Sequence, residues 1–131
     1  QHNRAINRHQ WDDSAIRTAL KHPANNHSQI YQKLTGLITL RTQHSAFHPN
    51  ATQYTLQLGD ALFGFWRQSI DRRQSIFCIF NITDQPQTLR IADLNLVATD
   101  DWHDLVSGEA IDSWQIEIQL SPYQCAWLSN R

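Results

Sequence analysis

The hydrophobic period of the chain changes near residue 50, and this change limits the possible folds more than any other feature. Upstream, apolar side chains recur three or four residues apart on one face of a helix expected over residues 28–42: Ile30, Leu34, Leu37 and Ile38. Downstream, apolar and polar residues alternate with a period of two, as strands require. The sequence therefore predicts an α+β chain in which helices precede a sheet.

Two helices are expected before the change of period. The first covers residues 13–20, and Asp12 or Asp13 is placed to accept hydrogen bonds from its free N–H groups. Pro23 ends it, because the residue before a proline avoids the helical region. The second helix covers residues 28–42, with Asn26 and Ser28 as candidate caps.

The β part reads as short strands joined by turns, which is typical of an antiparallel sheet or sandwich of five to seven strands. The expected strands cover residues 52–58, 61–68, 74–82, 87–91, 102–106, 114–120 and 123–128. The third is almost continuously apolar and is expected at the centre of the sheet, covered on both faces. Alternation places four side chains inward from the sixth strand: Trp114, Ile116, Ile118 and Leu120. The predicted core includes Phe77, Ile79, Ile116, Ile118 and Trp127.

Length and charge exclude several classes of protein. A chain of 131 residues cannot hold a (β/α)8 barrel, which needs about 250 residues. The net charge is −1 and the only lysines are Lys21 and Lys33, so a nucleic-acid surface is not expected. No apolar run reaches the length of a membrane span. The start, Gln1-His2-Asn3, has neither Met nor a signal core and indicates an internal position of a longer chain.

The cysteines and histidines do not indicate a disulfide framework or a metal site. Cys78 and Cys125 both lie in apolar strands and are expected to be buried free thiols, with a bridge between neighbouring strands as the alternative. His44 and His48 are four apart, but Pro49 prevents one helix from carrying both.

An acidic cluster and the tryptophans are two further candidate functional sites. Asp100 and Asp101 cannot both face one sugar from a strand, so these carboxylates and Asp104 are expected to be solvated in a turn or at a strand edge. Core packing is favoured over a sugar-stacking platform for the four tryptophans of the predicted strands: Trp66, Trp102, Trp114 and Trp127.

The segment Asn3-Arg4-Ala5-Ile6-Asn7-Arg8-His9 carries the clearest functional signal. Its arginines offer planar sets of donors, and its asparagines both donate and accept, which suits sugar hydroxyls. The segment resembles the G-R-x-I-N-R-H motif of the sucrose phosphorylases in glycoside hydrolase family 13. The resemblance continues through residues 102–109 and 121–128 to the final strands of that family. Within the motif, Asn3 replaces Gly, and Ala5 stands where an acidic residue is usual.

This resemblance implies the C-terminal segment of a sucrose phosphorylase-like enzyme. Residues 1–48 would be the last loop and helices of the catalytic barrel, and residues 49–131 an all-β C-terminal domain. Such an enzyme transfers glucose from an α-glucoside such as sucrose to inorganic phosphate with retention of configuration, in the cytoplasm and without a cofactor. The catalytic carboxylates would lie outside this chain, so the chain alone would be inactive.

Site residues follow from the same resemblance. Arg4 matches the arginine that helps to hold the glucosyl unit, and Asn7 and Arg8 would brace the loop. The acceptor stays open among sucrose, sucrose 6-phosphate, glucosylglycerate and glucosylglycerol. Without a barrel beside them, the helices are expected to self-associate through their apolar stripe. The alternative is a non-catalytic carbohydrate-binding or interaction module, which needs two or three exposed aromatic side chains on one face.

Overall fold

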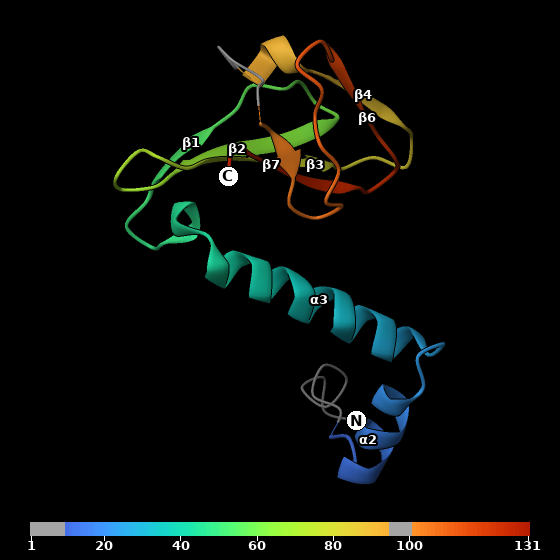
Figure 1. Cartoon of the computed structure of the whole chain (residues 1–131). Coiled ribbons are helices and arrows are strands. Elements are labelled where there is room, and N and C mark those ends of the chain that lie inside the picture. Colours follow the sequence, from blue (N-terminus) through green and yellow to red (C-terminus); the bar gives the residue numbers. More distant parts are fainter. Residues whose placement is uncertain (1–9, 95–100) are drawn as a thin grey trace, which may run out of the picture. The chain divides into compact units, whose positions relative to one another are not determined.

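In the computed structural model, the described residues are 10–94 and 101–131. The chain divides into two compact units, residues 1–39 and residues 40–131. Helices come first and strands follow, which confirms the order expected from the change of period (Figure 1). The assignment of residues 1–48 to a barrel and of residues 49–131 to a separate domain stays a prediction, because compactness does not test it.

Helix α2 covers Asp13–Lys21 and helix α3 covers Asn26–Gln43. The side chain of Asn25 accepts a hydrogen bond from the N–H of His27 at 2.9 Å, so α3 begins earlier than the sequence predicts. Ser28 is buried, and its hydroxyl donates to the carbonyl of Leu20 at 3.0 Å. This bond ties the first turn of α3 to the last turn of α2.

The β unit contains seven strands among the described residues. They are β1 (Thr52–Thr55), β2 (Leu62–Gln68), β3 (Ser75–Asn81), β4 (Gln87–Arg90), β5 (His103–Asp104), β6 (Glu117–Leu120) and β7 (Cys125–Ser129). Two 3-10 turns accompany them, η1 (Ser45–Phe47) and η2 (Ile91–Leu94). Each expected strand is present, and several are shorter than the alternation suggested.

The strands form two antiparallel sheets. One has the order β1-β2-β3-β7-β5, and the other pairs β4 with β6. Strand β3 lies at the centre of the larger sheet and is largely buried, as its apolar sequence predicts. Ile79 faces Gly64 of β2 on one side and Ala126 of β7 on the other.

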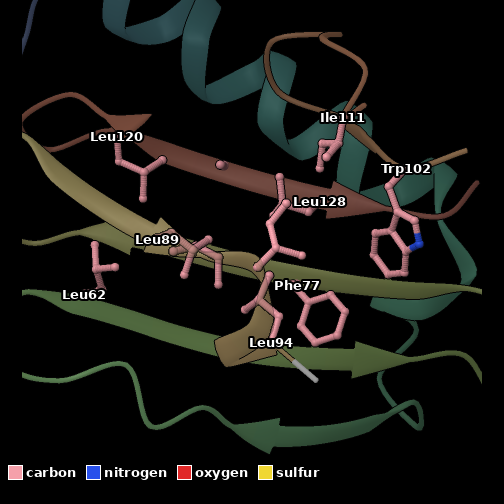
Figure 2. Close-up of a cluster of buried hydrophobic side chains, with 11 residues drawn as sticks. Leu62, Phe77, Leu89, Leu94, Trp102, Ile111, Leu120 and Leu128 are labelled. Atoms are coloured by element: carbon pink, nitrogen blue, oxygen red, sulfur yellow. The ribbon is translucent and has the colours of Figure 1, made fainter. Parts of the chain in front are cut away.

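The core of the β unit lies between the two sheets. Leu62, Phe77 and Leu128 from the larger sheet meet Leu89 and Leu120 from the smaller one (Figure 2). The turn η2, the segment before β5 and the loop before β6 complete the cluster with four side chains: Ile91, Leu94, Trp102 and Ile111. Burial of Phe77, Ile79 and Trp127 confirms three of the five predicted core residues.

The sixth strand is where the core prediction fails. Ile116 is 76% exposed and Trp114 is 78% exposed, although both were expected to point inward. The N–H of Gln115 donates to the carbonyl of Asp112, which forms a turn, and β6 begins only at Glu117. Alternation therefore applies only from β6 onward, where Ile118 is half-buried and Leu120 is buried.

Within the described residues, no helix combines the length and the apolar character needed to cross a membrane.

Candidate functional site

The residues expected to contact substrate lie outside the described part of the chain. Arg4, Asn7 and Arg8 belong to residues 1–9, so their predicted roles stay predictions. The described chain begins immediately after this motif and leads directly into α2. In the sequence, the helical unit therefore directly follows the segment that is proposed to contact substrate.

The start of α2 is fixed by a carboxylate. Oδ2 of Asp12 accepts hydrogen bonds from the N–H groups of Ser14 at 3.1 Å and Ala15 at 3.3 Å. The Ser14 hydroxyl donates to the same oxygen, and this bond, followed by that from Ala15, lowers the pKa of Asp12. Asp13 adds an ion pair with Arg17 at 2.8 Å. Local polar contacts thus define the helix that follows the motif.

An apolar hollow of about 330 Å³ lies between α2 and α3 within the helical unit. Ile16, Ile30 and Leu34 line it and are each more than a third exposed. Trp11 also lines it, and its ring meets that of His27 edge-on at 5.5 Å. Most of the expected helical stripe is therefore open, although Leu37 is half-buried.

In the β unit, Asp104 is a buried structural carboxylate rather than a solvated one. It is 6% exposed. Its Oδ1 accepts from the N–H groups of Trp127 at 2.7 Å and Val106 at 3.1 Å, and its Oδ2 accepts from Ser107 at 3.2 Å. The expectation of strand-edge solvation is therefore wrong for Asp104. Asp101 is exposed, and Asp100 lies outside the described residues.

The tryptophans of the β unit do not form an exposed platform. Trp102 and Trp127 are buried, Trp66 is half-buried, and Trp114 alone is exposed. Core packing, as predicted, describes Trp102 and Trp127, and it is wrong for Trp114. The alternative binding module would need two or three exposed aromatic side chains on one face. Tyr54, Phe63 and Tyr123 of this unit are also exposed, so the tryptophans alone do not test that alternative.

The two cysteines are free thiols in adjacent strands. Burial raises the pKa of Cys78 far above its usual range, and it raises the pKa of Cys125 to about 11. Neither thiol is therefore activated as a nucleophile at neutral pH. In the part of the chain that the structure describes, no group of three or more His, Cys, Asp or Glu residues could hold a metal ion.

Two known proteins are similar to this chain over almost its whole length. No family model matches the chain. It is 32% identical over 125 residues to a glucosylglycerate phosphorylase of Allomeiothermus silvanus, covering 95% of this chain and 20% of the relative. It is 29% identical over 127 residues to a glucosylglycerate phosphorylase of Escherichia coli, covering 97% of this chain and 21% of the relative. The chain is similar to the C-terminal segment of a sucrose phosphorylase-like enzyme. This confirms the resemblance seen in its motifs, and the chain spans about a fifth of the length of these relatives.

Solved structures support the fold of this chain. AmyP in complex with maltose superposes with a TM-score of 0.63 at 21% identity, covering 80% of this chain and 21% of AmyP. A MutB mutant from crystals soaked with trehalulose gives a TM-score of 0.60 at 14% identity, covering 86% of this chain and 19% of that one. Two helices followed by antiparallel sheets are therefore an arrangement shared with segments of much longer proteins.

Proposed function

We propose that this chain is the C-terminal part of a retaining α-glucoside phosphorylase, which transfers a glucosyl unit to inorganic phosphate. The observation that supports the proposal is the similarity to two glucosylglycerate phosphorylases over 95% and 97% of the chain. The homology supports the assignment of this chain to part of a glucoside-processing enzyme. Phosphorolysis, the transfer of the glucosyl unit to phosphate, is the more specific claim and needs an experimental test.

Retention of configuration requires two displacements. One carboxylate attacks the anomeric carbon and a second carboxylic acid protonates the leaving oxygen, and phosphate then replaces the enzyme carboxylate. In our proposal both carboxylates belong to the parts of the enzyme outside this chain. The chain supplies Arg4, whose guanidinium donates to hydroxyls of the glucosyl unit, while Asn7 and Arg8 hold the loop that carries it.

The substrate to test first is glucosylglycerate, the compound named in both relatives. Sucrose is the second candidate, because the Asn3–His9 segment resembles that of the sucrose phosphorylases. Both are α-glucosides, and both would present the same glucosyl unit to Arg4. The identity of the acceptor therefore has to be determined by activity measurements, because the residues of this chain do not define it.

A segment exchange tests the proposal. The 131 residues would replace the matching segment of the Escherichia coli relative. Release of glucose 1-phosphate would then be followed with glucosylglycerate and with sucrose. We expect the chimera to release glucose 1-phosphate and the isolated chain to release none. A folded chimera without activity, or turnover by the isolated chain, would contradict the proposal.

The role of Arg4 is tested in the same chimera. We expect Arg4→Ala to lower turnover by at least about a hundredfold, because a donor to the substrate is lost in a desolvated pocket. Arg4→Lys should not restore it, since an ammonium lacks the planar fork. The matched control is Arg17→Ala, which removes an arginine whose side chain is 71% exposed and forms an ion pair with Asp13 of the same helix. Equal losses in both variants would remove the argument for Arg4.

A further inference from the structure

The side chain of Gln74 is a buried amide with a fixed orientation. It lies just before β3 and is only 6% exposed. Its Oε1 accepts hydrogen bonds from the N–H of Ala46 at 3.0 Å and from the hydroxyl of Ser45 at 3.2 Å. Its Nε2 donates to the backbone oxygen of Arg131 at 3.3 Å. The N–H of Ala46 can only donate and the Arg131 oxygen can only accept, so the amide cannot turn over without losing both of these bonds.

This orientation determines the protonation state of His44. Nε2 of Gln74 lies 2.8 Å from Nδ1 of His44. Since Nε2 can only donate, Nδ1 must accept, and the imidazole is neutral with its proton on its own Nε2. A proton on Nδ1 would place two donors against each other.

The surroundings also favour the neutral ring. Burial, followed by the nearby His103, lowers the pKa of His44.

The guanidinium of Arg67 donates to the carbonyls of Ala46 at 3.0 Å and His48 at 2.6 Å. Arg41 and His48 line the same hollow as His44. The carboxylate of Asp71, in the turn before Gln74, is bonded to the hydroxyl of Ser69 and the N–H of Arg73. Among the described hydrogen bonds and ion pairs, no Asp or Glu carboxylate reaches the His44 ring. The terminal carboxylate of Arg131 accepts from the same Gln74 Nε2 that faces the ring.

Residues 44–48, which we call the latch, cover one face of the larger sheet. The ring of Phe47 packs on that of Trp127 at a centroid distance of 4.8 Å, and Ala46 is fully buried. Cys78 faces Trp127 across β3 and β7 in the sheet register, and it is also fully buried. Detachment of the latch would therefore expose apolar surface on this face.

We propose that the latch is an acid-sensitive device, in which a proton on Nδ1 of His44 opposes the Gln74 amide and releases residues 44–48 from the sheet. The unfolded chain binds this proton near the ordinary histidine pKa of 6.5 and the latched state binds it at lower pH. The latched state is therefore fully favoured above that value, and it loses stability as the pH falls from there toward the pKa of the latched ring.

Amide hydrogen exchange at Ala46 is the direct readout, because its N–H is held by Gln74 itself. The measurement uses the whole 131-residue chain and NMR protection factors, which are corrected for the intrinsic pH dependence of exchange. We expect protection at Ala46 to fall at least about tenfold between about pH 7.5 and about pH 5, the range in which histidine titrates. Protection at the centre of β3, at Ile79, should stay constant.

Two variants separate the latch from general acid sensitivity. Gln74→Glu supplies a carboxylate that accepts from both Nδ1–H and Ala46, so the pH dependence at Ala46 should disappear or reverse. His44→Gln has no titrating ring and should show constant protection. The control, His48→Gln, removes an exposed histidine of the same segment and should keep the wild-type response.

The wild-type chain also tests the idea if a variant fails to fold. The His44 ring protons should titrate below the ordinary histidine pKa of 6.5, and loss of Ala46 protection should follow the His44 titration. Constant Ala46 protection through that titration would overturn the proposal. So would loss of protection that persists in His44→Gln.

Discussion

The helical unit and the β unit stabilise themselves in different ways. In α2 no residue is buried, and in α3 Ser28 is the only buried one. The β unit instead closes a core of buried side chains between its two sheets. Both units carry large apolar side chains, so the presence of such side chains alone does not produce a core. A sheet pair can cover its own apolar face, whereas two short helices leave most of theirs open and depend on caps and local polar bonds.

The strongest test of this contrast truncates one apolar side chain in each unit. Ile79→Ala removes a fully buried side chain from β3 and should lower the free energy of unfolding by about 2–5 kcal/mol. Leu34→Ala removes a side chain that is 55% exposed in α3 and should change it by less than about 0.5 kcal/mol. Urea titrations followed by tryptophan fluorescence measure both. Equal effects would mean that the open face of α3 is covered in solution.

A second test concerns the polar part of the β unit. Asp104→Ala leaves three backbone N–H groups without their acceptor, including the buried N–H of Trp127. We expect a loss of about 1–3 kcal/mol in unfolding free energy. Asp112→Ala removes an exposed carboxylate from a nearby loop and should be close to neutral. An unchanged midpoint for Asp104→Ala would show that water replaces the carboxylate without cost.

The corresponding test in the helical unit removes the cap of α2. Asp12→Ala deprives two N–H groups of their acceptor and should reduce the helical circular dichroism signal at neutral pH. Because the pKa of Asp12 is lowered from 3.8, its stabilising effect is present above that value and declines as the pH falls below it. The signal difference between wild type and variant should therefore vanish in acid. Asp84→Ala, an exposed acid of the β unit, is the control.

The smallest expected effect is on association. The open hollow lined by Ile16, Ile30 and Leu34 should promote weak self-association of the chain. Leu34→Gln should lower the average mass measured by light scattering at high concentration. Ile70→Gln, which changes a side chain that is 65% exposed in the β unit, should not. A wild-type chain that stays monomeric at every concentration would contradict this prediction.

Much of the fold follows from local sequence, and its failures have physical causes. The apolar run of β3 is a strong local signal and was predicted, and the cap of α2 was predicted at Asp12 or Asp13, of which the structure uses Asp12. The inward placement of Ile116 failed because tertiary structure makes residues 112–115 a turn, which period-two alternation does not reveal. The buried role of Asp104 had a readable signal, since an aspartate often accepts from N–H groups two and three residues ahead.

Sequence alone predicts less about the contacts of the candidate site than about the fold. Arg4, Asn7 and Arg8 were singled out by their motif, and their proposed contacts stay a prediction because they lie outside the described residues. The bond between His44 and Gln74 joins residues 30 positions apart. No local sequence pattern predicts such a pair, because each residue by itself resembles an ordinary polar side chain at the end of a helix or strand.

The order of strands in the larger sheet has a consequence for biosynthesis. Strand β3 is made long before β7, its partner on one side, and the whole β4–β6 pair lies between them in sequence. While the ribosome is still producing the intervening residues, β3 is an apolar edge strand with unpaired backbone groups. Nascent chains that stop before Cys125 should therefore be the ones that aggregate or recruit chaperones, and solubility should recover once Ser129 has emerged.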